Sequence, residues 1–467
     1  MDKISATAAQ PVALFPPNTF LENLAIDESG IIYFTNLEAG AIHRLDPNQT
    51  TAENATAATE TPARIDTIAR IDGKPAGILH LGANGILING WDANGIPTIW
   101  LLTDNTVTPV HQPAGAQFLN GMTILEDHTI LICDSYTGCI YQYDQKANTS
   151  TIWLQHPLLE KAHPQTPMPA ANGIKRHGDA IFISNTDKKL LIRIPMTNGQ
   201  PGEPEILLDN INLDDFAFDE EGNLYAATHI HNSVVKITPQ RSVTTIAGEP
   251  QGLAGSTAVA FGRTDNDRHC IYVTTNGGMT LPPAGGIQQG RVIKIPIRIP
   301  TPCEWAGGIA AFEKLTGVFY KKVLQDPILE PVFRHMPPNH PIHVAHFLAE
   351  VLKGPKKYSE EYGEDALKHM VGKHLGRHLN EVQRKQWVRL IMESADEIGF
   401  PDDPEFRSTF TAHIEWGTRI AVINSQTTEN PVTPEDHLPH WGWGEVKGPF
   451  DVVGSLFRQK PADSDPD

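Results

Sequence analysis

The part of the chain before Pro300 repeats one short pattern six times. Each copy starts with a pair of residues that leads into an apolar strand, a turn, and two further apolar strands. The copies begin at six positions: Glu22, Ala76, Asn120, Asn172, Asp214 and Ser256. Their spacing of 42 to 54 residues is close to that of four-stranded propeller blades. No long stretch of this part has the 3.6-residue period of a helix, so the pattern predicts an all-β, six-bladed β-propeller over residues 12–300.

The first residues of the six copies form a column of equivalent positions. In a propeller the innermost strands line a central channel, so these positions converge on its axis. The column holds two carboxylates, Glu22 and Asp214, two carboxamides, Asn120 and Asn172, and no basic residue. Two buried carboxylates without a counter-charge are costly, and a divalent cation removes that cost. Oxygen ligands suit Ca²⁺ or Mg²⁺ better than Zn²⁺, so the column predicts a divalent metal site of that kind.

A second interpretation of the column stays open at the level of the sequence. Asn-Gly at positions 120 and 172 is also the commonest turn dipeptide, and Glu22 and Asp214 would then merely begin strands. The nearby pair His229 and His231 is expected on one face of a strand. We interpret that pair as packed or solvent-facing rather than as a second metal site.

Three segments carry a family resemblance. The run Phe20-Leu-Glu-Asn-Leu-Ala, the Asn-Gly pairs and the run Asp214-Asp-Phe-Ala-Phe-Asp resemble the gluconolactonase/regucalcin (senescence marker protein) family of six-bladed propellers. The resemblance implies a catalytic divalent metal held by Glu22, Asn172 and Asp214, with Asn120 at a neighbouring substrate or metal position. It further implies hydrolysis of a small lactone or ester, with Asp214 as base or nucleophile. Asp215-Phe216 replaces the Gly-Met often found in the family, and no matching sugar-acid-binding arginine stands near Asn120.

The period of the sequence changes after Pro302. Helical spacing of apolar residues predicts helices over residues 312–324, 342–352, 366–379, 381–397 and 404–424, separated by prolines and glycines. These segments make up an all-α domain over residues 303–426, followed by a Pro-rich tail over 427–467. On the third of these helices, His374 and His378 are expected to share one face. They lack the glutamate of the H-E-x-x-H zinc motif, whereas a single axial histidine beside an apolar pocket is typical of haem.

The helical part resembles the group II truncated haemoglobins. The resemblance rests on the pair Phe319-Tyr320, on Phe333, on Gly354-Pro355 with Tyr358-Ser359, and on the interval from His374 to Trp387. It implies an all-α globin-like fold that binds haem b, with His374 as the proximal ligand. The implied haem pocket consists of Phe319, Tyr320, Phe333, His340, Val344 and Trp387. His340 takes the distal position by ungapped count from Phe347, and His343 and His346 are close competitors. The polar hydrogens of Tyr320 and Trp387 favour oxygen, another diatomic gas or peroxide as the ligand.

Composition excludes several classes of partner. The chain of 467 residues carries 37 Lys+Arg against 55 Asp+Glu, a formal charge of −18, which argues against nucleic acid and anionic membranes. No apolar run is long enough for a membrane helix, no signal peptide is evident, and the 4 cysteines lack CxxC spacing, so we expect a cytoplasmic protein.

Three functional hypotheses remain. The first is a lactone or ester hydrolase whose globin senses or supplies a diatomic gas or redox equivalents. The second is a haem protein for oxygen, NO or peroxide whose propeller is a non-catalytic ligand-binding scaffold. The third, which we favour least, makes both parts binding modules.

Overall fold

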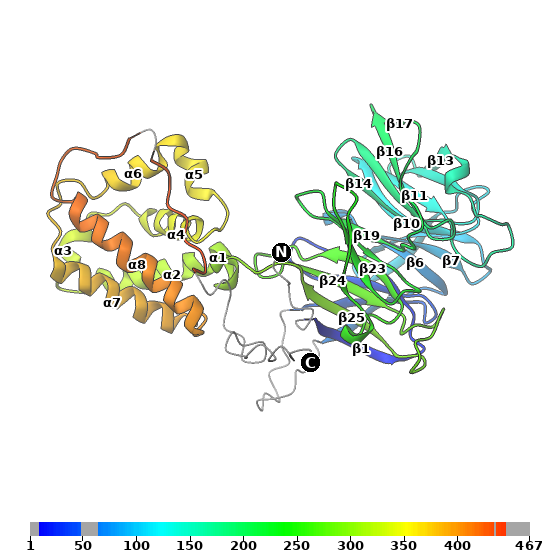
Figure 1. The fold of residues 1–467 in the computed structure, drawn as a ribbon, viewed down its shortest axis with the longest axis horizontal. Helices are drawn as coiled ribbons and strands as arrows, with labels where there is room; N and C mark the ends of the chain where they lie inside the picture. The colour runs from blue at the N-terminus through cyan, green and yellow to red at the C-terminus, as the bar shows by residue number, and fades with distance from the viewer. Residues whose placement is uncertain (1–8, 48–63, 434–435, 445–467) are drawn as a thin grey trace, which may run out of the picture. The chain divides into compact units, whose positions relative to one another are not determined.

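The computed structural model describes residues 9–47, 64–433 and 436–444, and the chain divides into two compact units, residues 1–297 and 298–467 (Figure 1). Of the predicted tail, residues 434–435 and 445–467 lie outside the described residues. None of the helices in the described part of the chain is both long and apolar enough to cross a membrane.

The first unit consists of six antiparallel sheets. The first three are β2 (Leu21–Ile26), β3 (Ile32–Asn36), β4 (Ala41–Leu45) and β5 (Ile65–Arg70); β6 (Gly73–His80), β7 (Ile86–Asp92), β8 (Pro97–Thr103) and β9 (Thr106–His111); and β10 (Leu119–Glu126), β11 (Thr129–Asp134), β12 (Cys139–Asp144) and β13 (Thr149–Gln155). The fourth and fifth are β14 (Ala171–His177), β15 (Ala180–Asn185), β16 (Leu190–Thr197), β17 (Gln200–Pro201) and β18 (Glu205–Leu208); and β19 (Phe216–Phe218), β20 (Leu224–Ala227), β21 (Val234–Ile237) and β22 (Val243–Ala247). The sixth is β23 (Ser256–Phe261), β24 (Cys270–Thr275), β25 (Gln289–Pro296) and β1 (Gln10–Pro17).

The sheets close into a ring. The first strand, β1, pairs antiparallel with the last, β25, so the sixth blade is built from both ends of the unit. Around the axis, β2, β6, β10, β14, β19 and β23 each contact the corresponding strand of the next blade, and β23 returns to β2. The predicted six-bladed propeller is confirmed, and these six strands are its innermost ones.

The inner strands are irregular where the column residues lie. Regular pairing breaks between Leu21 and Leu24 and at the corresponding places of β6, β10, β14 and β23. Such β-bulges re-aim side chains out of the normal alternation. Asn120 and Asn172 therefore stand within β10 and β14, and the interpretation of the two Asn-Gly pairs as turns is wrong.

The glycines of these pairs serve a close approach between blades. A Cβ atom at Gly121 would lie 2.3 Å from the carbonyl oxygen of Asn172, and one at Gly173 would lie 2.7 Å from that of Asp214. A side chain larger than hydrogen would therefore push neighbouring inner strands apart. The Asn-Gly pairs keep the column residues of adjacent blades close together.

The second unit is helical and comprises α1 (Pro302–Trp305), α2 (Gly308–Val323), α3 (Glu330–Phe333), α4 (His340–Val351), α5 (Lys357–Tyr362), α6 (Ala366–Gly372), α7 (Glu381–Glu397) and α8 (Pro404–Asn424). Helix α2 packs against α4 and α7, and α7 packs against α8. Phe312, Leu315 and Phe319 lie on the buried face of α2 and are fully enclosed. Four of the five predicted helices are confirmed as α2, α4, α7 and α8, and the short helices α1, α3 and α5 are additional.

One predicted helix ends early. The segment predicted as a helix over residues 366–379 is helical only to Gly372, and His374 lies in the turn that follows. The amide of Gly376 donates to the carbonyl of Thr427, so this segment pairs with the chain after α8 instead of continuing α6. His378 has a positive φ of 51°. The expectation that His374 and His378 share one helical face is therefore wrong.

Candidate functional sites

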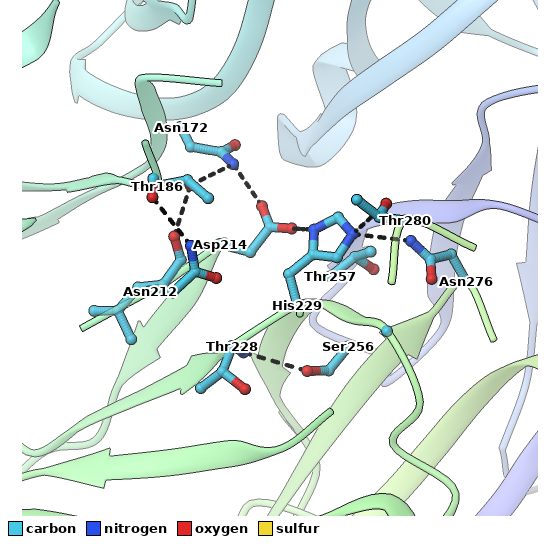
Figure 2. A network of polar contacts seen from close by, with 12 residues as sticks. Asn172, Thr186, Asn212, Asp214, Thr228, His229, Ser256, Thr257, Asn276 and Thr280 are labelled. Carbon is cyan, nitrogen blue, oxygen red and sulfur yellow. Dashed lines mark hydrogen bonds and ion pairs between the residues drawn. The ribbon is translucent and has the colours of Figure 1, made fainter. Parts of the chain in front are cut away.

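Asp214 is the centre of a buried polar network in the propeller channel (Figure 2). It lies two residues before the start of β19, and its side chain contacts residues of two other segments. Its Oδ1 accepts a hydrogen bond from Nδ2 of Asn172 at 2.7 Å. Its Oδ2 lies 2.6 Å from Nδ1 of His229. Both oxygens of the carboxylate are thus fixed by nitrogen atoms.

The amide of Asn172 has one defined orientation. The hydroxyl of Thr186 donates to the carbonyl of Leu213 at 2.7 Å, so its oxygen accepts from Nδ2 of Asn172 at 3.0 Å. The amide nitrogen of Asn172 therefore serves Thr186 and Asp214, and its oxygen is turned away from Asp214 (Figure 2). That oxygen is available to a ligand in the channel.

Asn120 repeats this arrangement in the preceding blade. The hydroxyl of Ser135 donates to the carbonyl of Ala171 at 2.6 Å and accepts from Nδ2 of Asn120 at 3.3 Å. The side chain of Asn120 is therefore hydrogen-bonded to Ser135 and not to Asp214. Its amide oxygen, like that of Asn172, is left for a ligand.

Glu22 is buried beside the same carboxylates. Its Oε2 has no hydrogen-bond partner among the described residues. Burial, followed by the charges of Asp214 and Asp215, holds the pKa of Glu22 well above its ordinary value. Burial also raises the pKa of Asp214, against the opposing hydrogen bonds from His229 and Asn172. The structure therefore brings Glu22, Asn172 and Asp214 together, as the sequence predicts.

A third carboxylate enters the site with its own counter-charge. Nζ of Lys175, on β14, lies 2.6 Å from Oδ1 of Asp215, and Nδ2 of Asn23 lies 3.3 Å from Oδ2. The column itself holds no basic residue, but Lys175 reaches the site from three positions further along the same inner strand. Of the three carboxylates in this site, Glu22 and Asp214 have no lysine or arginine partner among the described residues.

His229 is a site residue that the sequence analysis missed. Strand β20 ends at Ala227, so the expectation that His229 and His231 share a strand face is wrong. His229 has a φ of 46°, forms an isolated bridge with Ser256 and points at Asp214, whereas His231 is exposed. No local sequence motif identifies His229 as a site residue. An alignment of the blades would have identified it, because His229 follows its column residue by 15 positions, as Ser135 follows Asn120.

In the helical unit, His374 is tethered by one ring nitrogen. Its Nδ1 lies 3.1 Å from the carbonyl oxygen of Met370. A carbonyl only accepts, so Nδ1 carries the proton and Nε2 keeps its lone pair. Burial lowers the pKa of His374, which favours the neutral ring that metal binding requires.

The other predicted pocket residues cluster around Tyr320. Its hydroxyl lies 3.0 Å from Nε2 of His340, and its ring centroid lies 5.7 Å from that of Phe333. The rings of Phe319 and Trp387 are 4.8 Å apart, and Val344 is half-buried against the same core. Burial, followed by the charges of neighbouring basic groups with His343 and Arg377 first among them, lowers the pKa of His340 to about 4.

The two competing histidines have acidic partners instead. Nε2 of His343 lies 3.3 Å from Glu361, and Nε2 of His346 lies 3.2 Å from Glu313. Among these three histidines of α4, the one in contact with Tyr320 is therefore His340.

Comparison with known proteins identifies the helical unit. Residues 303–413 match a family model described as bacterial-like globin. The helical unit carries a globin domain. The Group 2 truncated hemoglobin YjbI of Bacillus subtilis is 24% identical over 122 residues, which cover 26% of this chain and 89% of that protein.

Other relatives bear different names. A putative hetero-Diels-Alderase, asR5, of Sarocladium schorii is 34% identical over 122 residues, or 22% of this chain, and a second from a Phoma species is 27% identical over 173 residues. The matches cover only 30% and 49% of those two proteins. The crystal structure of regucalcin, a calcium-binding protein from Agrobacterium tumefaciens, has a TM-score of 0.47 at 16% identity and covers 63% of this chain and 95% of its own.

The residues present fit a haem in the globin domain and a divalent cation in the propeller. Nε2 of His374 is left free for iron by the bond of Nδ1 to Met370. In the propeller, Oε2 of Glu22 is buried and unpartnered among the described residues, and Asn172 turns an amide oxygen away from its hydrogen-bond partners. This all-oxygen donor set suits a hard cation such as Ca²⁺.

Proposed function

We propose that this chain holds two chemically distinct sites. The globin domain binds haem b and, through it, a diatomic gas. The propeller binds a divalent cation and hydrolyses a small lactone or ester. The tether of His374 to Met370 is the observation that carries the first assignment, and the buried, unpartnered Oε2 of Glu22 beside Asp214 carries the second.

In the globin domain, the chain provides one ligand and a mostly apolar pocket. Nε2 of His374 would hold the iron, and haem supplies reversible gas binding when present. Tyr320 and His340 form the polar part of the pocket, where a hydroxyl or ring N–H stabilises a polar ligand. The side chains that exclude water from it are Phe319, Phe333, Val344 and Trp387.

A haemin titration of the purified full chain tests this half. We expect a Soret band that saturates at one haem per chain and disappears in His374→Ala. The band should survive in His340→Ala, because His340 contacts Tyr320 and is not the residue assigned as the iron ligand. A wild-type chain that takes up haemin without a Soret shift would contradict the assignment.

In the propeller, Glu22, Asn172 and Asp214 would hold the cation, which polarises the substrate carbonyl when bound. Each oxygen of Asp214 accepts one described bond and keeps lone-pair capacity for another proton. Asp214 takes the proton of the water that attacks the carbonyl carbon, and the proton then passes to the alkoxide released when the ring C–O bond breaks. The amide oxygen of Asn120 is placed to accept from a substrate hydroxyl.

A lactone panel tests the propeller half. Metal-stripped protein should be inactive, and Ca²⁺, Mg²⁺ or Mn²⁺ should restore the hydrolysis. Asp214→Asn should lower kcat by at least about 100-fold, because the proton acceptor is lost. Hydrolysis at equal rates with excess chelator would count against the cation mechanism.

A second candidate function for this chain is ring formation by a hetero-Diels–Alder reaction. It is favoured by the 34% identity to the putative hetero-Diels-Alderase of Sarocladium schorii. Such a cycloaddition joins a four-atom and a two-atom component without consuming water, so it needs no proton acceptor. Turnover of a diene and a carbonyl or alkene partner that is unaffected by Asp214→Asn would favour this candidate. Tight ligand binding without any turnover would favour a non-catalytic scaffold.

A further inference from the structure

Three consecutive blades build the same side-chain pair around the channel. Asn120 contacts Ser135, Asn172 contacts Thr186, and Asp214 contacts His229. The partners are separated by 15, 14 and 15 positions, and each second residue follows the second strand of its blade. His229 thus occupies the position that carries a hydroxyl in the two preceding blades.

The chemistry of the second residue matches that of the first. In the two asparagine blades the hydroxyl hydrogen is given to the next blade, so Ser135 and Thr186 act as acceptors for the amide. Asp214 as a carboxylate has no hydrogen to give and needs a donor instead. An imidazole N–H meets that need, and His229 Nδ1 lies 2.6 Å from Oδ2 of Asp214.

A loop of the sixth blade fixes which nitrogen carries the proton. Oδ1 of Asn276 accepts from the backbone amides of Gly278 at 2.9 Å and Met279 at 3.1 Å. Its Nδ2 is therefore the atom that faces His229, 3.1 Å from Nε2. Because Nδ2 is a donor, Nε2 of His229 accepts and Nδ1 holds the hydrogen. The hydroxyl of Thr280 lies 3.0 Å from the same Nε2 (Figure 2).

We propose that His229 is a positioning residue that holds the Asp214 carboxylate in the orientation required by the channel cation, an inference that rests on the proposed function. Asn172 fixes one carboxylate oxygen and His229 fixes the other. Partners of this kind orient metal-binding side chains, and their loss typically weakens metal binding about 10–100-fold. The loop containing Asn276 sets the tautomer and thereby acts on Asp214 through His229.

Calcium titration of the metal-stripped full chain by calorimetry tests the proposal. His229→Leu removes both nitrogens at similar volume and should raise the Kd for Ca²⁺ by about 10–100-fold. His229→Asn retains an amide N–H near the place of Nδ1 and should stay within about fivefold of wild type. His231→Leu changes an exposed histidine two positions away and should bind Ca²⁺ as wild type does.

Two results of the titration would overturn the proposal. One is wild-type affinity in folded His229→Leu, and the other is a loss in His229→Asn as large as in His229→Leu. A wild-type chain that binds no Ca²⁺, Mg²⁺ or Mn²⁺ would refute the proposed cation function itself.

A second measurement tests the role of His229 even if the chain binds no cation. Long-range ¹H–¹⁵N spectra of metal-free wild type, with ¹⁵N-labelled histidine, report the tautomer and do not depend on a variant folding. We expect His229 protonated at Nδ1, with a signal that shifts in Asn276→Ala and not in His231→Leu. Protonation of the neutral ring at Nε2 would overturn the positioning role whatever the calcium result.

Discussion

Nδ2 of Asn172, in the fourth blade of the propeller, donates a hydrogen bond of 2.7 Å to Oδ1 of Asp214, in the fifth. Thr186 accepts a second hydrogen bond from the same nitrogen, so the amide oxygen of Asn172 is turned away from Asp214 (Figure 2). This bond between two blades is what makes the column a single site, because it aligns a neutral oxygen donor beside a charged one.

Asn172→Asp is predicted to make the propeller depend on a cation. The change replaces the amide donor with a carboxylate that faces Asp214, so the metal-free protein should lose about 2–4 kcal/mol in free energy of unfolding. Calcium should restore more stability to this variant than to wild type. Thermal unfolding with and without Ca²⁺ measures both effects, with the exposed Asn105→Asp as the matched control. Equal midpoints of the metal-free Asn172→Asp and Asn105→Asp variants would contradict the prediction.

Gly173→Ala is predicted to destabilise the propeller by about 1–3 kcal/mol through overpacking between blades. The added Cβ would lie 2.6 Å from Oδ1 of Asp215 and 2.7 Å from the carbonyl oxygen of Asp214. Gly285→Ala is the control, because a Cβ there has no atom within 4 Å. Urea unfolding of the two variants gives the comparison, and the account fails here if both behave like wild type.

The globin domain is predicted to lose stability in mild acid through His413. Burial in α8 lowers the pKa of His413 to about 4, below its ordinary value of 6.5. The His413 ring therefore binds a proton less tightly in the folded state than in the unfolded state. Its contribution to the free energy of unfolding is complete above about pH 6.5 and is lost as the pH falls toward 4. Between pH 7 and pH 5 the loss is about 2 kcal/mol.

His413→Leu should remove that part of the pH dependence. Urea unfolding at pH 7 and pH 5 measures it, with the globin transition identified as the one that haemin shifts. His231→Leu, in the propeller, should leave the acid loss of this transition unchanged. A His413→Leu variant with the full wild-type acid loss would show that other groups cause it.

Tyr320→Phe is predicted to weaken the hold of the pocket on a bound gas. The hydroxyl of Tyr320 is 3.0 Å from His340 and lies among the predicted pocket residues. Loss of one hydrogen bond of about 1 kcal/mol should raise the oxygen dissociation rate of the reconstituted ferrous protein about five- to tenfold. Stopped-flow displacement by CO measures that rate, and an unchanged rate would place the hydroxyl outside the ligand's reach.

The sequence was sufficient for those features that repeat or are periodic. The six-fold repeat predicts the propeller and brings Glu22, Asn172 and Asp214 into one column, and helical spacing predicts α2, α4, α7 and α8. Helices α1, α3 and α5 span 4, 4 and 6 residues, too few to show a period. The end of α6 depends on a backbone bond from Gly376 to Thr427, which local sequence does not encode.

The parts of the site that were missed depend on register rather than on motifs. His229 becomes visible only when the second strands of the blades are aligned with Ser135 and Thr186 as references. Lys175 was overlooked because the column considers one position per blade, whereas its long side chain reaches Asp215 from a different position on β14. Both omissions concern partners that support the column rather than the column itself.

The most direct test of the two-site account is the metal and haem content of one purified sample of the full chain after reconstitution. We predict one haem and one divalent cation per chain. His374→Ala should lose the haem and keep the cation, and Asp214→Ala should lose the cation and keep the haem. Unchanged haem and cation contents in both variants would contradict the account.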